Sequence, residues 1–223
     1  MKTRVIAIDG PAGSGKSTTA RLVATRLGFV YLDTGAMYRA ITLKVLRERV
    51  DPRSEKEVSR IAESSSVHIR HRDCSYRIIL DGKDVTDEIR DPAIDENVSH
   101  VSEQKKVREI LVNLQKKIGE TQNVVAEGRD VTTVVFPDAL VKVYLDCDLN
   151  ERARRRTLEL QQKGISDSVE EQAGKIASRD EIDSKRRLSP LKKDQDAFVI
   201  DTTHLTIQEQ VDKVVQIYEE RLS

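Results

Sequence analysis

Residues 10–17 read Gly-Pro-Ala-Gly-Ser-Gly-Lys-Ser and fit the pattern G-x-x-x-x-G-K-[ST] in full. An apolar run from Val5 to Ile8 comes before them and a helical pattern follows, so this loop joins a strand to a helix. Its glycines let the backbone curl until successive N–H groups point at one anion, and the following helix adds its positive N-terminal end. The stretch therefore predicts a loop that binds the phosphates of a nucleoside triphosphate.

Two side chains of this loop have predicted tasks of their own. Lys16 is expected to reach the β- and γ-phosphates, and the Ser17 hydroxyl is expected to ligate Mg²⁺. The predicted triphosphate-binding set is Gly10, Pro11, Ala12, Gly13, Ser14, Gly15, Lys16, Ser17 and Thr18.

The composition of the chain argues against several classes of protein. Lys and Arg total 38 in 223 residues, as do Asp and Glu, so the formal net charge is zero. This balance offers no electrostatic footprint for nonspecific binding to nucleic acid or to acidic membranes. The two cysteines have no metal-ligand spacing, and no apolar run approaches the length of a membrane span. We therefore expect a cytoplasmic protein with no nucleic-acid or membrane partner. We also expect a monomer, although composition does not bear on that.

Short apolar runs alternate with helical patterns along most of the chain. The runs cover residues 3–9, 29–33, 124–127, 140–145 and 197–201. Continuous apolar strands separated by helices indicate a parallel sheet with both faces covered. The predicted fold is α/β, a P-loop NTPase-type parallel five-stranded sheet flanked by helices.

Residues 67–90 break this alternation. Runs 67–72 and 76–80 alternate like half-exposed strands, and Asp81-Gly82 is a strong hairpin turn signal. We interpret the segment as a small antiparallel β insert, an accessory subdomain near the substrate. Helical patterns follow it at about 91–100 and 103–119.

Three helix starts carry the pattern of a capping box, in which Ser or Thr is followed three residues later by Glu. The pairs are Ser54 with Glu57, Ser168 with Glu171, and Thr206 with Glu209. Each pair is expected to satisfy backbone N–H groups at the start of its helix.

Charged side chains follow the predicted strands, at the edge where open parallel sheets bind ligands. Three groups of arginines there suit phosphoryl transfer, which needs positive charge around the moving group. The groups are Arg39 with Arg129; Arg152, Arg155 and Arg156 on one helical face; and the stripe of Arg179, Asp183 and Arg186. A solvated helix face stays an alternative for each group. Helices at 149–164 and 169–184, hinged near Gly164, suit a lid that excludes water from the triphosphate.

Several longer segments together resemble the bacterial cytidylate kinases of the nucleoside monophosphate kinase family. They are residues 10–18, 32–39, 127–137, 151–156, 179–186 and 189–191, and the resemblance covers nearly the whole chain. The most specific segment is Glu-Gly-Arg-Asp-Val-Thr-Thr-Val-Val-Phe-Pro at 127–137, in which Thr132 stands where the family pattern has Gly. The insert also looks like the extra segment of the long bacterial form.

The resemblance implies an ATP-dependent kinase that converts CMP and dCMP to CDP and dCDP, with Mg²⁺ as cofactor. The implied catalytic residues are Lys16, Arg129, Arg155 and Arg179. The implied CMP-binding residues are Thr34, Arg39, Ser99, Arg108, Arg129, Asp130, Arg179, Asp183 and Arg186. The implied organisation is a single domain, with a core of residues 1–50, 120–148 and 195–223, a monophosphate-binding insert at about 51–119, and a lid at about 149–187.

Cytosine selection follows the same family pattern, in which Asp130 and Ser99 take N4 and Arg108 takes N3. Cytosine offers a donor at N4 and an acceptor at N3, whereas uracil reverses both edges. For Asp33, two roles stay open: a magnesium ligand through water, or a residue that orients Lys16.

Two other readings of the function stay open from the residues. One is a P-loop kinase of another small acceptor, such as UMP, dTMP or shikimate. The other is a nucleotide-dependent switch or binding protein, which would need a glutamine that positions water near the γ-phosphate.

Overall fold

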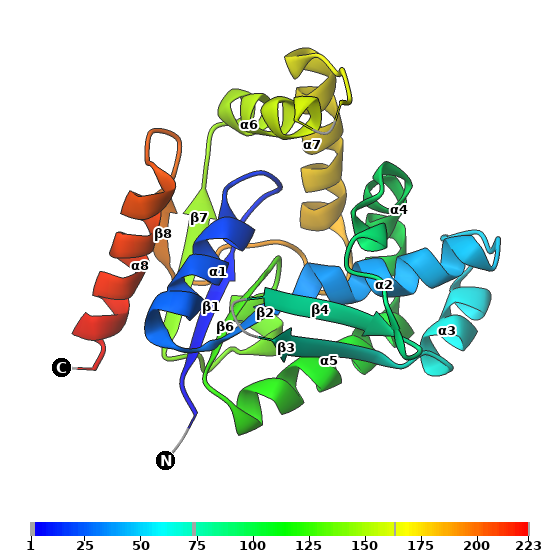
Figure 1. The fold of residues 1–223 in the computed structure, drawn as a ribbon, viewed down its shortest axis with the longest axis horizontal. Coiled ribbons are helices and arrows are strands. Elements are labelled where there is room, and N and C mark those ends of the chain that lie inside the picture. Colours follow the sequence, from blue (N-terminus) through cyan, green and yellow to red (C-terminus); the bar gives the residue numbers. More distant parts are fainter. Residues whose placement is uncertain (1–2, 73–74, 163, 223) are drawn as a thin grey trace.

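A computed structural model describes residues 3–72, 75–162 and 164–222. Its central sheet holds five parallel strands in the order β2-β6-β1-β7-β8 (Figure 1). The strands are β1 (Val5–Asp9), β2 (Val30–Asp33), β6 (Val124–Gly128), β7 (Val141–Asp146) and β8 (Phe198–Asp201). The predicted α/β fold with a five-stranded parallel sheet is confirmed.

Side-chain alternation along the strands divides the apolar core between the two faces of the sheet. Ile6 and Ile8 of β1 belong to a buried cluster with α1 (Lys16–Leu27) and α8 (Ile207–Glu220). Ala7, between them, belongs to a second cluster with α2 (Thr34–Arg47) and α5 (Lys105–Thr121). Because both faces are covered, β1, β2 and β6 are apolar up to their carboxyl ends, whereas β7 carries Lys142, whose Nζ donates to Asp194 at 3.2 Å.

The strand register brings these carboxyl ends to one edge. Asp9 of β1 lies opposite Gly128 of β6, and Asp33 of β2 lies opposite Glu127. The polar residues that follow β1, β2 and β6 are therefore neighbours in space, as the sequence predicted.

The insert forms a separate antiparallel sheet of three strands. These are β3 (Val67–Arg72), β4 (Ser75–Leu80) and β5 (Lys83–Asp84). The Asp81-Gly82 turn has positive φ at both residues, 48° and 81°, as a tight hairpin requires, and it joins β4 to β5. This short third strand was not predicted. Val67, Ile78 and Leu80 share a buried cluster with α2, so the insert packs on the main core.

Helices surround the insert in sequence. They are α3 (Glu55–Glu63) before it and α4 (Pro92–Ser102) after it, while a 3₁₀ turn (Glu88–Arg90) ends the insert. The two helices predicted at about 91–100 and 103–119 are confirmed as α4 and α5.

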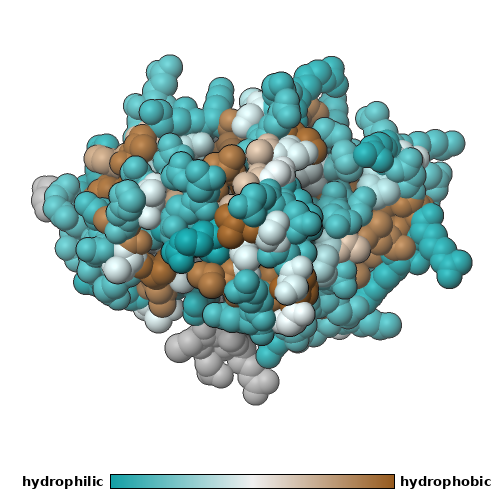
Figure 2. All heavy atoms as spheres, turned by 90° about the horizontal axis from the view of Figure 1, so that it is seen from above, coloured by the Kyte–Doolittle hydropathy of each residue, from teal (hydrophilic) through white to brown (hydrophobic). Residues whose placement is uncertain are grey.

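The predicted lid helices are α6 (Leu149–Gln161) and α7 (Val169–Lys185). They lie side by side above the carboxyl edge of the sheet (Figure 1). Seen from that side, the surface is mostly hydrophilic, with apolar residues scattered over it (Figure 2). Among the described residues, no helix is both long enough and apolar enough to span a membrane.

Two of the three predicted capping boxes form. Ser168 with Glu171 and Thr206 with Glu209 make both reciprocal bonds. Ser54 does begin α3, but its side chain makes no capping hydrogen bond, so the predicted box there is wrong. A capping pattern marks where a helix starts, whereas the bond also depends on the side-chain rotamer.

This difference predicts unequal costs for two matched substitutions. Thr206→Ala is expected to lower the free energy of unfolding by about 1 kcal/mol, because an N–H at the start of α8 loses its acceptor. Ser54→Ala is expected to cost less than about 0.5 kcal/mol, because no capping bond is lost. Urea unfolding of both variants and the wild type measures this, and equal costs would contradict the assignment.

Candidate active site

The phosphate-binding loop connects β1 to α1 and is packed so closely that two of its glycines are required. A Cβ on Gly10 would lie 2.1 Å from the carbonyl oxygen of Leu145. A Cβ on Gly15 would lie 2.8 Å from Oε1 of Gln210, and its φ of 92° disfavours other residues. Since α1 begins at Lys16, the loop leads directly into the positive end of that helix.

Lys16 lies buried over its own loop. Its Nζ donates to the carbonyl oxygen of Pro11 at 2.5 Å and lies 3.4 Å from Oγ of Ser14. Burial, with the nearby positive charge of Arg129, lowers the pKa of Lys16 to about 7. A phosphate group within reach of Nζ would stabilise the charged form, so the position suits anion binding.

Ser17 donates its hydroxyl to Oε1 of Glu127 at 2.7 Å. Burial and the charge of Asp33 raise the pKa of the Glu127 carboxyl. A hydroxyl and a carboxylate oxygen in contact at the triphosphate loop are the hard oxygen ligands that Mg²⁺ takes, usually one or two from the protein with the rest from phosphates and water. The pair fits a magnesium ion. The sequence prediction missed Glu127, although it is the last residue but one of β6 and opens the Glu-Gly-Arg-Asp segment.

A second group of buried charges lies around Asp130. One of its carboxylate oxygens pairs with Nη2 of Arg108 and the other lies 3.3 Å from Nη2 of Arg186. Arg108 also donates to Oγ of Ser189 at 3.1 Å and to the carbonyl oxygen of Ser102 at 3.0 Å. Both arginines are buried, so Arg108 is not a surface residue. Ser99, also predicted here, is buried on α4 and accepts the Ser102 hydroxyl through its carbonyl oxygen.

The loop after Asp130 is held by Thr132, the residue that departs from the family pattern. The hydroxyl and the N–H of Thr132 donate to Asp9 Oδ2 at 2.6 and 2.7 Å, and the N–H of Val131 donates to Oδ1 at 2.9 Å. Asp9 is fully buried, and burial raises its pKa to about 6. Thr132 therefore supplies a hydrogen bond that glycine lacks, to a carboxyl group that needs it.

The predicted group of Arg179, Asp183 and Arg186, on and just after α7, lies beside Arg129, which follows β6. Nε of Arg129 donates to Asp183 at 2.9 Å, while Arg179 and Arg186 each lie 4.0 Å from the same carboxylate. Asp183 is buried, yet these arginines hold its pKa below the usual value. The stripe is not a solvated helix face, and the structure brings its members together with Arg129.

The three arginines predicted to share one face of α6 each have different partners. Arg152 donates to the carbonyl oxygen of Ala12 at 3.1 Å and pairs with Asp180 of α7. Arg155 bonds Glu151 and donates to the carbonyl oxygen of Thr202 at 2.6 Å. Arg156 pairs with Asp95 and Glu159. The alternative of a solvated face is wrong for this group, because the helix faces the loops of the core.

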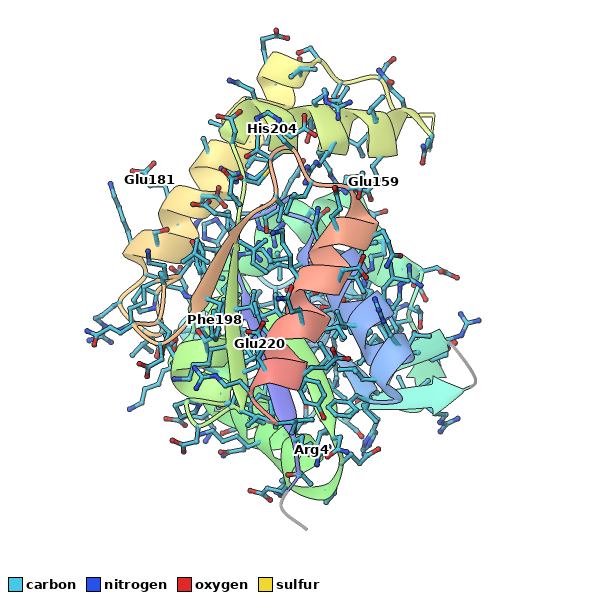
Figure 3. The ribbon with its side chains drawn as sticks, turned by 90° about the vertical axis from the view of Figure 1, so that its left-hand side faces the viewer. Arg4, Glu159, Glu181, Phe198, His204 and Glu220 are labelled. Atoms are coloured by element: carbon cyan, nitrogen blue, oxygen red, sulfur yellow. The ribbon has the colours of Figure 1, made fainter. Side chains whose placement is uncertain are left out.

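Arg155 also lines a cavity that the sequence prediction missed. The cavity has a volume of about 560 Å³ and lies between the start of α6 and the loop from β8 to α8. Figure 3 shows His204 in that loop, beneath α6. The lining residues are Glu151, Arg154, Arg155, Thr203, His204, Leu205, Thr206, Ile207 and Gln210.

Comparison with known proteins settles the family. The family model described as Cytidylate kinase matches residues 6–220. The chain belongs to the cytidylate kinase family. It is 51% identical to a cytidylate kinase of Caldanaerobacter subterraneus subsp. tengcongensis, over 95% of this chain and 92% of that protein. It is 48% identical to a cytidylate kinase of Alkaliphilus oremlandii, over 95% and 96% of the two chains.

This membership confirms the predicted resemblance and makes the chain a nucleotide kinase, a transferase named for its action on cytidylate. A solved structure of an uncharacterized protein from Eubacterium ventriosum has a TM-score of 0.53 at 12% identity, covering 97% of this chain and 99% of that one. At that identity the likeness concerns the fold alone.

In this kinase the insert contacts the carboxyl edge of the main sheet at Asp33, the last residue of β2. Oδ2 of Asp33 accepts from Tyr76 at 3.1 Å and from Arg90 at 2.9 Å, while Oδ1 caps α2 by accepting from Ala36 N. The rings of Tyr31 and Tyr76 meet edge to face at 5.0 Å. Both carboxylate oxygens of Asp33 thus bind α2 and the insert, and the two roles left open for this residue stay predictions.

The burial of Asp9 predicts a pH dependence of stability. Because its pKa rises from 3.8 to about 6, the folded kinase holds this proton more tightly than the unfolded chain does. The resulting stabilisation is full below about pH 4 and is lost as the pH rises through about 6. Relative to Asp9→Asn, the unfolding free energy of the wild type is expected to fall by about 3 kcal/mol across that window.

Urea unfolding of both proteins from about pH 4 to 7 measures this difference. Other carboxylates titrate in both proteins and cancel in the comparison. A difference that stays level, or that rises with pH, would contradict the assignment.

Proposed function

We propose that this chain transfers the γ-phosphoryl group of ATP to CMP and dCMP, yielding ADP with CDP or dCDP. The observation that carries the proposal is the buried group of Asp130, Arg108 and Arg186 at the same sheet edge as the phosphate-binding loop. A triphosphate loop supplies the donor, and a fixed pair of acceptor and donor side chains supplies base selection.

The chemistry of the base supports cytosine. The Asp130 carboxylate accepts hydrogen bonds only, which suits N4 of cytosine, and the Arg108 guanidinium donates only, which suits N3. Uracil would place a carbonyl against Asp130 and an N–H against Arg108. Each mismatch leaves a buried polar group unpaired, at roughly 1–3 kcal/mol. Ser99, buried on α4, is assigned to N4 with Asp130.

On the donor side, residues 10–18 are assigned to the phosphates of ATP, and the cavity beside Arg155 is assigned to its base and ribose. Ser17, with Glu127 beside it, would hold Mg²⁺, which when bound neutralises charge on the β- and γ-phosphates. Lys16 contacts the same phosphates as a point charge. Because Lys16 is buried, water screens its attraction to the phosphates less than at the surface.

On the acceptor side, Thr34, Arg39 and Arg129 are assigned to the monophosphate, and Arg179, Asp183 and Arg186 to the transferring group and the pentose hydroxyls. An oxygen of the CMP phosphate attacks the γ-phosphorus in line and the bond to the β-phosphate oxygen breaks. The attacking group is already anionic at neutral pH, so the reaction requires no general base. Arginines around the moving group stabilise its charge.

Water must be kept from competing with CMP, and the proposed lid at about 149–187 does this by covering the triphosphate. The contacts of Arg152 and Asp180 with Ala12 connect lid and loop directly. The division into core, insert and lid, the monomeric state and the cytoplasmic location stay predictions.

The experiment that tests the function measures ADP formed from MgATP with CMP, dCMP, UMP, dTMP, AMP and shikimate offered separately. Turnover confined largely to CMP and dCMP is expected. Strong turnover with another acceptor would contradict the assignment of Asp130, Ser99 and Arg108 to cytosine. ATP hydrolysis that does not depend on the acceptor would favour a nucleotide-dependent switch protein.

Base selection by Asp130 predicts a specificity change. In Asp130→Asn the amide both donates and accepts, so it no longer favours cytosine. We expect the ratio of kcat/KM for CMP over UMP to fall at least about tenfold, equivalent to about 1.4 kcal/mol. Asp138→Asn, at an exposed residue just after the 127–137 segment, is the matched control. An unchanged ratio in Asp130→Asn would overturn the base assignment.

Lys16 predicts a loss of turnover rather than of folding. Lys16→Ala is expected to lower kcat at least about a hundredfold, because the transition state loses a charged donor. Lys213→Ala, an exposed residue of α8, should keep the wild-type rate. Steady-state kinetics, with circular dichroism to verify folding, measures the effect; near-wild-type turnover of Lys16→Ala would refute its role.

A further inference from the structure

Three arginines from three helices converge on one carboxylate, that of Asp95. Arg39 of α2 donates to Oδ1 through Nε at 3.3 Å and through Nη2 at 2.8 Å. Arg156 of α6 donates to Oδ2 at 2.8 Å, and Arg179 of α7 lies 3.5 Å from Oδ1. Asp95 itself belongs to α4, which packs against both α2 and α7 (Figure 1).

This arrangement is the kind of site that binds a phosphate group. Guanidinium groups bind phosphate and carboxylate oxygens with the same donor geometry. Arg39 donates hydrogen bonds to Asp95 from both Nε and Nη2, which form one edge of its guanidinium group. The same arginine is assigned to the phosphate of CMP. One edge cannot serve two anions fully, so the carboxylate and a phosphate compete for it.

The charges also leave room for a stronger anion. Three guanidinium groups share the single charge of Asp95. Arg156 also pairs with Glu159, and the Asp183 carboxylate, 4.0 Å from Arg179, is already paired with Arg129. Nε of Arg179 is buried without a hydrogen-bond partner in the described structure. Burial, with the charges of Arg39 and Arg129, lowers the pKa of Arg179 to about 10, so its charged form is incompletely compensated. A phosphate dianion, with more charge and three free oxygens, satisfies such a cluster better than a carboxylate does.

The Asp95 carboxylate is also within reach of solvent. Its side chain is 23% exposed, and those of Arg39, Arg156 and Arg179 are 16%, 27% and 24% exposed. An incoming anion can therefore approach the arginines without first opening the core.

We propose that Asp95 is an internal stand-in for the phosphate of the acceptor nucleotide. It holds Arg39, Arg156 and Arg179 together in the free kinase, and the substrate phosphate displaces it. Asp95 thereby lowers the affinity for the monophosphate, because the phosphate must first break the contacts between Asp95 and the arginines. The inference rests on the proposed function in that the displacing anion belongs to CMP.

The test compares Asp95→Asn with Glu96→Gln, which removes the same charge from the next, exposed residue of α4. Asn keeps the shape of Asp but binds arginine weakly. We expect KM for CMP to fall about tenfold in Asp95→Asn, more in KM than in kcat, because a larger fraction of the arginines is ready to bind. Glu96→Gln should change KM by less than about twofold.

Inorganic phosphate provides a readout that does not depend on turnover. In Asp95→Asn, phosphate is expected to raise the melting temperature more steeply than in the wild type, and to inhibit competitively against CMP at about tenfold lower concentration. Asp95→Ala, which removes the carboxylate entirely, should shift both measurements in the same direction.

A KM for CMP that rises in Asp95→Asn, or stays level together with the phosphate response, would overturn the proposal. A rise would mean that Asp95 positions the arginines for substrate instead of competing with it. If the wild type fails to phosphorylate CMP while phosphate still stabilises Asp95→Asn more, the proposed function fails and the competition of Asp95 with phosphate stands.

Discussion

The compensation of charge at the carboxyl edge of the sheet is the constraint on which the rest of this molecule depends. Arginines from several elements meet there, and most of them pair with an aspartate from a different part of the chain. Asp183 of α7 serves Arg129, and Asp130 serves Arg108 and Arg186. Removing one partner of a buried pair leaves an uncompensated charge, so these pairs limit how the elements are arranged.

The same kind of contact joins the two additions to the core. The insert meets the active edge where Arg90 and Tyr76 bind Asp33, which also caps α2. The lid meets the phosphate-binding loop where Asp180 accepts the N–H of Ala12. Each addition therefore attaches by polar contacts beside the reacting groups, where a bound anion changes the charge balance.

Sequence reasoning identified most of the candidate site because each motif is local. The triphosphate loop is a run of eight residues whose glycines are required by close packing, and Asp130 and Arg129 lie within one segment. It missed Glu127 as the partner of Ser17, since the two are 110 residues apart and meet only when β6 pairs with β1. It missed Asp95 for the same reason: its three arginines come from three helices.

By itself the sequence determined the α/β class, the positions of the five parallel strands, the phosphate-loop motif and the family, because periodicity and contiguous motifs are properties of neighbouring residues. Only the tertiary structure decided which carboxylate compensates which arginine. It also decided that Ser54 leaves its capping bond unmade, that Thr132 stabilises Asp9, and that Asp33 binds the insert. Those outcomes depend on distances between segments far apart in the chain, which the packing of helices on the sheet sets.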